Sequence, residues 1–177
     1  MRIIAGDLGG RIFDSPHTHR THPMSDRVRG ALFNTLGDIH GLTVFDAYSG
    51  TGALSFEAIS RGASSALAID VDKDAYLCIV ENIDKLSLKD QVTVLRKNVS
   101  GWSRNNQHKM FDVVLADPPY NDIRPNVIER LFGHLTVGGL LVLSWPGSEP
   151  VRQFDGLDVI AAKKYGDAQL VFYRKIK

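Results

Sequence analysis

The sequence predicts an α/β fold in which a mainly parallel sheet carries helices on both faces. Three observations favour this class. From residue 43 onward, short apolar runs alternate with segments of helical periodicity, which is typical of parallel strands joined by helical crossovers. A glycine-rich turn follows the first of these runs, where such folds bind their ligands. The chain of 177 residues is long enough for one domain with a substantial core.

An extension is expected ahead of this core. We expect a single domain in which residues 1–40 form the extension and residues 41–177 form the core. Residues 2–5 and 11–13 are predicted to be two short strands, and the glycine-rich residues 6–10 are predicted to join them as the turn of a β-hairpin.

A helix is predicted to follow the hairpin, starting at Ser25, which is a good N-cap residue. Its apolar residues recur at helical spacing on one face, and Arg27 and Arg29 fall outside that face. The predicted apolar face consists of Val28, Ala31, Leu32 and Leu36.

The core elements follow from the alternating pattern. Strands are predicted at 43–47, 66–70, 92–95, 111–116, 140–144, 157–163 and 168–174, and helices near 52–61, 73–86 and 124–134. The turn Tyr165-Gly166-Asp167 joins the last two strands, so these are expected to form a terminal hairpin. Lys163 and Lys164 are interpreted as a solvated strand end.

The composition is that of a soluble globular protein, with 44% hydrophobic and 23% charged residues. No apolar run approaches the roughly 18 residues of a membrane span, and charged residues such as Arg2 and Asp7 argue against a signal peptide. The single Cys78 cannot form an internal disulfide, which favours a reducing cytoplasm. The net charge of +1 weighs slightly against a nucleic-acid enzyme.

The glycine-rich turn spans residues 46–53 at the end of the first core strand. Gly50 and Gly52 allow a sharp turn and a close approach of backbone amides to a ligand. Asp70 ends the next strand about 20 residues later, where a carboxylate can accept both hydroxyls of a ribose. Asp46 precedes the glycines and suits a ligand with a cation, such as the ammonium of S-adenosylmethionine (SAM).

Two alternatives apply to this turn. A nicotinamide dinucleotide would use a similar site, but its fingerprint requires a third glycine where this chain has Ser55. The turn could also be purely structural. Asn98 follows the third strand, where its amide could meet an adenine edge, and a surface asparagine at a strand end is an equal alternative.

The strongest motif is Asp117-Pro118-Pro119-Tyr120, directly after the apolar run 111–116. Two prolines fix the backbone and remove two amide donors. The exocyclic amine of a base is a poor nucleophile because its lone pair is delocalised into the ring. If the Asp117 carboxylate and the Pro118 carbonyl accepted its two hydrogens, the nitrogen would become pyramidal and could attack a sulfonium methyl in line. Tyr120 offers a face on which the base can stack.

Together these residues resemble the class I SAM-dependent methyltransferases that carry an N/D-P-P-Y/F motif. More narrowly, the chain is similar to the bacterial RsmD family, which methylates N2 of a guanine in 16S ribosomal RNA. The more specific part of the resemblance is the opening segment 2–11 and the helix start Ser25-Asp26-Arg27-Val28-Arg29. The resemblance runs almost end to end.

The resemblance implies a Rossmann-like class I methyltransferase fold, with a seven-stranded, mostly parallel sheet and an antiparallel last strand. It implies SAM as cofactor and 16S ribosomal RNA or the small ribosomal subunit as partner. The sequence itself leads us to expect a cytoplasmic protein without a metal, and nothing in it requires a dimer, so we expect a monomer. The implied catalytic residues are Asp117, Pro118, Pro119 and Tyr120. The implied cofactor-binding residues are Asp46, Tyr48, Ser49, Gly50, Gly52, Asp70, Val71, Asn98 and Val99. Arg2, Arg11, Arg27 and Arg29 are implied to be available for RNA phosphates.

The chain departs from the family pattern at two places. The family usually has Arg-Pro-Thr before the Ser/Thr-Asp pair, and this chain has Thr21-His22-Pro23-Met24. The family usually has Glu after Val-Arg, and this chain has Gly30, at a helix-interior cost of up to about 1 kcal/mol relative to Ala. Both departures affect the expected identity of the methylated nucleotide more than the expected type of reaction.

Other functions are open alternatives. The nearest is an adenine-N6 methyltransferase on DNA or RNA, because the same loop chemistry serves both amines. Residues 53–116 contain no insertion for DNA target recognition, which favours RNA. A non-catalytic SAM-binding module and a small nicotinamide-dependent oxidoreductase are further classes. His17, His19 and His22 are irregularly spaced and have no accompanying cysteine, so no metal site is expected there.

Overall fold

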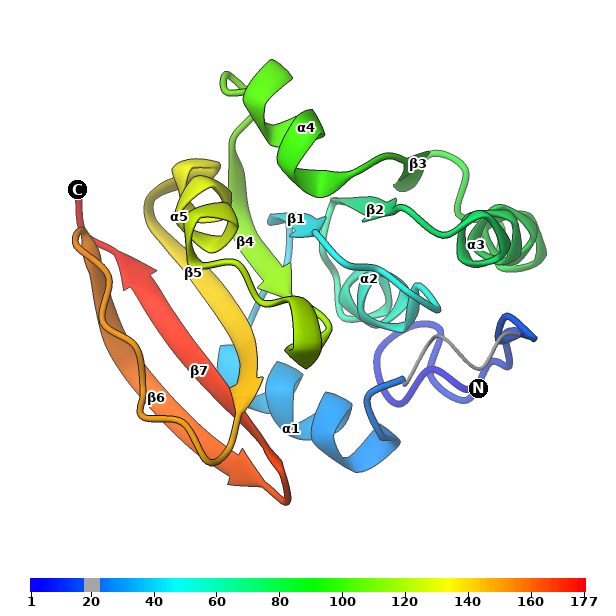
Figure 1. Ribbon diagram of the computed structural model, residues 1–177. Coiled ribbons are helices and arrows are strands. Elements are labelled where there is room, and N and C mark those ends of the chain that lie inside the picture. The colour runs from blue at the N-terminus through cyan, green and yellow to red at the C-terminus, as the bar shows by residue number, and fades with distance from the viewer. Residues whose placement is uncertain (18–22) are drawn as a thin grey trace. The chain divides into compact units, whose positions relative to one another are not determined.

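A computed structural model describes residues 1–17 and 23–177. The seven strands form one sheet in the order β3-β2-β1-β4-β5-β7-β6 (Figure 1), which confirms the predicted seven-stranded α/β architecture. The chain divides into two compact units, Met1–Val99 and Ser100–Lys177, and each is described by itself. The division into an extension and a core stays a prediction.

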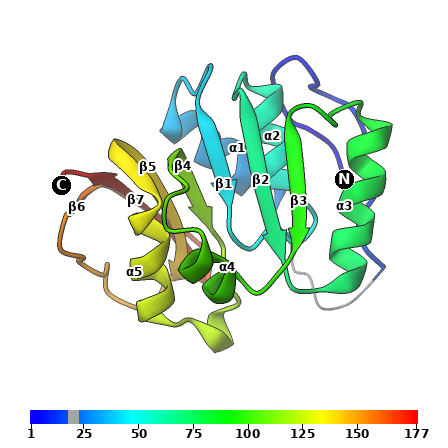
Figure 2. The same ribbon diagram turned by 90° about the horizontal axis from the view of Figure 1, so that it is seen from above.

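The first unit is built on three parallel strands that lie side by side (Figure 2). Its elements are α1 (Asp26–Leu36), β1 (Thr43–Asp46), α2 (Ala53–Ser60), β2 (Ser65–Asp70), α3 (Lys73–Lys85) and β3 (Val92–Arg96). Strand β2 pairs with β1 on one side and with β3 on the other, while α2 and α3 pack against these strands. Every residue of α2 is buried, including Glu57.

Helix α1 begins where Ser25 predicts, because the Ser25 side chain accepts a hydrogen bond from the Val28 amide at 3.2 Å. Its buried face was predicted only in part, with Leu32 buried as expected. The buried residues are Arg29, Gly30, Leu32 and Phe33, whereas Val28, Ala31 and Leu36 are only half-buried. The face is shifted because it includes a fully buried arginine with polar partners, which a search for apolar periodicity leaves out.

The predicted N-terminal hairpin is present as a single antiparallel bridge between Arg2 and Ile12. Its turn packs directly on the end of α2. Gly6 has a φ of 85°, and a Cβ on it would lie 1.8 Å from the carbonyl oxygen of Ser60, so only glycine permits this approach. Ile4 covers Gly30 of α1, where an added Cβ would meet Ile4 Cδ1 at an ordinary 3.7 Å.

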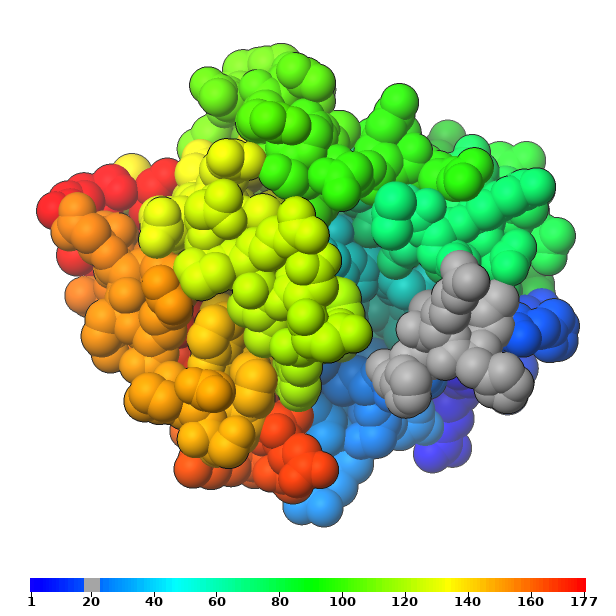
Figure 3. Space-filling model, viewed as in Figure 1, coloured from blue at the N-terminus to red at the C-terminus, as the bar shows by residue number. Residues whose placement is uncertain are grey.

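The second unit holds the parallel pair β4 and β5 and the terminal antiparallel hairpin β6–β7. Its elements are α4 (Val99–Asn105), whose first residue belongs to the first unit, β4 (Phe111–Ala116), the 3-10 turn η1 (Tyr120–Asp122), α5 (Pro125–Gly133), β5 (Leu135–Pro146), β6 (Leu157–Tyr165) and β7 (Ala168–Lys175). Strand β7 lies between β5 and β6, so the predicted hairpin is confirmed. Helix α5 packs on β4 and β5, and β6 forms part of the surface of this unit (orange in Figure 3).

Two features of the second unit were not predicted. Helix α4 has the sequence Val-Ser-Gly-Trp-Ser-Arg-Asn, whose glycine and serines have low helix propensity. Strand β5 begins at Leu135. The predicted start lay near residue 140, because Gly138-Gly139 is typical of a turn. The strand tolerates these glycines through a register shift against β4 between Phe111 and Val113.

In the part of the chain that the structure describes, no helix is long and apolar enough to cross a membrane. Among the same residues, no group of three or more His, Cys, Asp or Glu side chains is arranged to hold a metal ion. His17 is exposed, and His19 and His22 lie outside the described residues.

Candidate functional site

The glycine-rich turn joins β1 to α2 in the first unit. Gly50 and Gly52 have φ angles of 51° and 78°, in the left-handed region that glycine adopts without strain. A Cβ on Gly52 would also lie 3.0 Å from Ile79 Cγ1 and 3.0 Å from Phe56 Cε2. The turn is therefore tightly constrained, and Gly52 is required by both its conformation and its surroundings.

Asp70 ties this turn to the end of β2. Its Oδ2 accepts a hydrogen bond from the Gly50 amide at 2.7 Å, and its Oδ1 accepts one from the Asp72 amide at 2.8 Å. A carboxylate oxygen can accept more than one hydrogen bond, so this half-buried group keeps acceptor capacity for a ligand hydroxyl. The next residue, Val71, is 65% exposed, which provides an apolar surface beside the polar group.

Two polar residues lie beneath the turn. Asp46 is fully buried, and its Oδ2 accepts a hydrogen bond from the Ser55 hydroxyl at 2.8 Å. Sequence reasoning considered Ser55 only as a missing glycine, whereas the structure shows that it holds Asp46. The buried Ser49 hydroxyl has no hydrogen-bond partner among the described residues. A buried hydroxyl without a partner is costly, so this position fits a ligand that supplies the missing hydrogen bond.

The other predicted cofactor residues differ in exposure. Tyr48 is half-buried, Asn98 is exposed and Val99 is buried. All of the predicted cofactor-binding residues belong to the first unit.

The Asp117–Tyr120 loop follows β4 in the second unit, as the sequence predicted. Pro118 is buried, Pro119 is exposed, and the chain then enters η1. The Tyr120 ring is 40% exposed, and its hydroxyl lies 2.7 Å from the hydroxyl of Ser144 on β5. Ser144 also acts on Asp117, because its hydroxyl lowers the pKa of that carboxyl. Ser144 was not identified from the sequence, and its only signal was a hydroxyl residue at the end of an apolar strand.

The environment of this loop perturbs two titratable groups. Burial raises the pKa of the Asp117 carboxyl, and the hydrogen bond from Ser144 opposes part of that rise. Burial also raises the pKa of Tyr120, its hydrogen bond with Ser144 opposes the rise, and the charge on Asp117 adds to it. A half-buried carboxylate beside an exposed aromatic ring can accept an N–H from a planar ring that stacks on the tyrosine.

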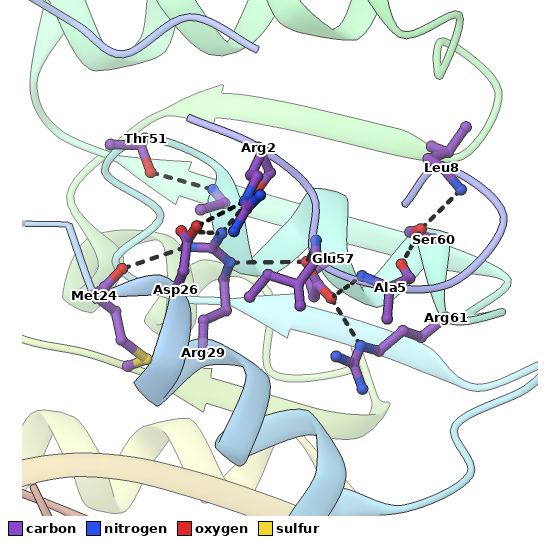
Figure 4. Close-up of polar contacts among 12 residues, drawn as sticks. Arg2, Ala5, Leu8, Met24, Asp26, Arg29, Thr51, Glu57, Ser60 and Arg61 are labelled. Carbon is purple, nitrogen blue, oxygen red and sulfur yellow. Dashed lines mark hydrogen bonds and ion pairs between the residues drawn. The ribbon is translucent and has the colours of Figure 1, made fainter. Parts of the chain in front are cut away.

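Arg29 is not available for RNA phosphates, and that prediction was wrong. Its side chain is fully buried, with Nη2 donating to the Arg2 carbonyl at 2.7 Å and to Asp26 Oδ1 at 2.9 Å (Figure 4). Nη1 donates to the Met24 carbonyl at 3.3 Å. The guanidinium is held inside because these acceptors replace its water, as a buried charge requires.

The other three arginines are exposed, but two of them have partners within the first unit. Arg11 donates to the carbonyls of Lys85 and Leu86 at 3.0 and 3.4 Å, which are acceptors at the end of α3. Arg2 Nε lies 3.1 Å from Asp26 Oδ2.

Glu57 is a buried polar centre that sequence reasoning missed. Its Oε2 accepts a hydrogen bond from the Ile4 amide at 2.9 Å, and its Oε1 accepts from the Ala5 amide at 3.2 Å and from Arg61 Nε at 2.8 Å. Arg29 Nε lies 3.8 Å from Oε2. Figure 4 shows how this carboxylate joins the N-terminal segment to α1 and α2.

Comparison with known proteins gives consistent matches along the chain. A family model described as Conserved hypothetical protein 95 matches residues 1–174. Ribosomal RNA small subunit methyltransferase D of Escherichia coli is 31% identical over 144 residues, covering 80% of this chain and 69% of that protein. The protein of the same name from Buchnera aphidicola is 31% identical over 120 residues, covering 67% of this chain and 62% of its own length, less than two thirds. The structure of yhhF, a candidate methyltransferase from Escherichia coli, matches with a TM-score of 0.89 and 25% identity, covering 99% of this chain and 98% of that one.

Proposed function

Because this chain belongs to the Conserved hypothetical protein 95 family and is an RsmD-like methyltransferase of the class I fold, we propose that it methylates the exocyclic N2 amine of a guanine in 16S ribosomal RNA, with SAM as the methyl donor. The observation that carries the proposal is the Asp117–Tyr120 loop, where a half-buried carboxyl of raised pKa lies close to an exposed tyrosine ring. The names of the relatives support ribosomal RNA as the substrate class. The proposed partner is the small ribosomal subunit or its RNA, and the proposed enzyme is a cytoplasmic monomer.

In this proposal the first unit holds the cofactor. Asp70 accepts the ribose hydroxyls, Val71 packs against the adenine ring, and the turn from Tyr48 to Gly52 surrounds the methionine end, with Asn98 and Val99 beside the adenine. The unpartnered Ser49 hydroxyl supports this fit. Asp46 is fully buried and bonded to Ser55, so we assign it to shaping the turn. When bound, SAM supplies an electrophilic methyl group.

In this proposal the second unit binds the target base and makes its exocyclic amine nucleophilic. Asp117 accepts one N–H through its carboxylate, the Pro118 carbonyl accepts the other, and Pro119 keeps the loop rigid. The base stacks on Tyr120. Two accepted hydrogens favour a pyramidal nitrogen whose lone pair is available, so the catalytic effect is one of positioning and electrostatic preorganisation. The raised pKa of Asp117 also suits this carboxylate to take the proton that the methylated amine must lose.

The test is transfer of labelled methyl from SAM to purified small ribosomal subunits, total RNA and DNA, followed by nucleoside analysis. We expect labelled N2-methylguanosine in the small-subunit RNA. The variant Asp117→Ala removes the acceptor and is expected to lower kcat by about 100-fold or more. Asp158→Ala, which removes an exposed carboxyl of β6, is the matched control and is expected to retain activity.

Cofactor binding is measured separately from transfer. SAM at about 100 times its Kd is expected to stabilise the folded protein by about 2.7 kcal/mol, equally in Asp117→Ala but not in Asp70→Ala. Label found in N6-methyladenine would support the proposed chemistry of the loop, but it would show that the substrate is an adenine amine rather than a guanine amine. Absence of label from every nucleic acid, in a protein that SAM stabilises, would refute the proposed function.

A further inference from the structure

Ser144 contacts Tyr120 and influences Asp117, the two reactive groups of the Asp117–Tyr120 loop. Its side chain projects from β5, is 4% exposed, and lies 2.7 Å from the Tyr120 hydroxyl. The Ser144 hydroxyl also lowers the pKa of the Asp117 carboxyl, as a hydrogen-bond donor to the carboxylate does. One buried hydroxyl on a strand therefore links the carboxyl and the aromatic ring of a loop that is otherwise partly exposed.

The chemistry of the three groups favours one direction for hydrogen bonds among them. An ionised carboxylate can only accept, and a serine hydroxyl carries a single hydrogen. A Ser144 hydrogen that points to Asp117 leaves the Ser144 oxygen to accept the hydrogen of Tyr120. The result is a directed series in which Tyr120 donates to Ser144 and Ser144 donates to Asp117.

We propose that Ser144 is a positioning residue of the methyl transfer, which orients the Asp117 carboxylate and the Tyr120 ring together through this directed series. The inference rests on the proposed function for its catalytic meaning. With its hydroxyl held by Ser144, Tyr120 presents its ring in a fixed orientation for the base. With Ser144 bonded to it, the Asp117 carboxylate is held in one orientation and retains acceptor capacity for the amine hydrogen.

The kinetic test compares Ser144→Ala with Ser144→Thr, which keeps the hydroxyl on a β-branched side chain suited to a strand. We expect Ser144→Ala to lower kcat by about 10- to 100-fold, the range of a misplaced catalytic group, with the affinity for SAM unchanged. Ser144→Thr is expected to recover most of the loss. Tyr120→Phe keeps the ring and removes the hydroxyl that hydrogen-bonds Ser144. Because both substitutions break the same hydrogen bond, the double variant with Ser144→Ala should be no slower than the slower of the two single variants.

A second readout does not depend on RNA. NMR titration of the labelled Asp117 carboxyl carbon is expected to give a higher pKa in Ser144→Ala than in the native protein, because a hydrogen bond to the carboxylate is lost. Ser144→Thr should restore the native value. A purely structural role of Ser144 would not produce this pattern.

Two results would overturn the inference: an unchanged pKa of Asp117 in a folded Ser144→Ala, or losses in kcat that add fully in the double variant. Failure of the native protein to methylate RNA would refute the proposed function instead, and the titration would still decide whether the directed series exists. Thermal unfolding of each variant establishes that it is folded.

Discussion

At the scale of single residues, Asp117 combines a functional advantage with a cost to stability. Its pKa is raised above the ordinary carboxyl value because burial disfavours the charged form. The folded protein therefore binds this proton more tightly than the unfolded chain does. The contribution of this group to stability is fully present below the ordinary carboxyl pKa, and it is lost as the pH rises through the raised value.

This sign predicts the effect of Asp117→Asn, which removes the charge and keeps a hydrogen-bond acceptor. We expect the variant to be more stable than the native protein at neutral pH and to lose that advantage as the pH falls towards the ordinary carboxyl pKa of about 3.9. Urea unfolding across this pH range measures the difference. Asp158→Asn is the control, and an advantage for Asp117→Asn that did not vary with pH would contradict the explanation.

The roles of single residues were only partly predictable from the sequence. Asp117 and Asp70 were found because each ends an apolar strand, where ligands bind in this fold class. Arg29 was misassigned, because helical periodicity counts apolar residues and treats a charged one as exposed. Ser144 and Glu57 were missed because their importance depends on partners far away in the sequence, such as Tyr120 for the first and Ile4 for the second.

At the scale of elements, α2 is the point to which the N-terminal segment is attached. The buried Glu57 carboxylate accepts hydrogen bonds from the Ile4 and Ala5 amides and forms an ion pair with Arg61. The Ser60 hydroxyl accepts a hydrogen bond from the Leu8 amide at 2.9 Å. This attachment explains why a segment with a single β-bridge nevertheless holds a defined position. Two of these hydrogen bonds and the ion pair with Arg61 depend on a single carboxylate, that of Glu57.

We therefore expect Glu57→Gln to be strongly destabilising. The change leaves the buried Arg29 with less compensating charge, and removal of one partner from a buried ion pair costs about 3–5 kcal/mol. Urea unfolding measures the loss, and hydrogen exchange at the Ile4 and Ala5 amides should accelerate. Glu129→Gln on the exposed face of α5 is the control and should change stability by less than about 0.5 kcal/mol. A native-like stability for Glu57→Gln would show that the carboxylate is not the attachment point.

The elements themselves were mostly predictable. Strand β4 was predicted at its observed bounds, 111–116, because a run of apolar and β-branched residues ends at two prolines. The start of β5 and all of α4 were not predicted, since Gly138-Gly139 and the serines of α4 have local preferences for turns and caps. In both places the neighbouring strands and helices outweigh the local preference.

At the scale of the whole molecule, the charge is nearly balanced, with 21 basic and 20 acidic residues. The structure removes Arg29 from the residues available to RNA and gives Arg11 and Arg2 partners within the first unit. Of the four predicted arginines, Arg27 remains as an exposed candidate for a phosphate contact. Recognition of a folded RNA shape, rather than a strong general attraction to phosphate, suits this distribution.

This balance predicts a weak dependence of RNA binding on salt. Each phosphate contact to single-stranded RNA adds about 0.7 to the magnitude of the slope of log affinity against log salt concentration. If Arg27 and two or three other basic side chains make such contacts, we expect a slope of only about 2 to 3 in magnitude. Arg27→Ala should reduce it by about 0.7, whereas Glu129→Gln should leave it unchanged. Filter binding of small-subunit RNA at several salt concentrations makes the measurement. A steep slope, or one that Arg27→Ala does not change, would contradict this view of the surface.

The terminal hairpin has a consequence for behaviour at high concentration. Strand β6 ends the sheet, and a strand in that place presents a row of backbone groups on which another chain can add. Its side chains include the exposed Asp158, Lys163 and Lys164, and its register shifts between Val159 and Ala161. Charges and irregular register both disfavour the addition of a foreign strand. The hairpin that completes the sheet therefore also disfavours the addition of another chain at this edge.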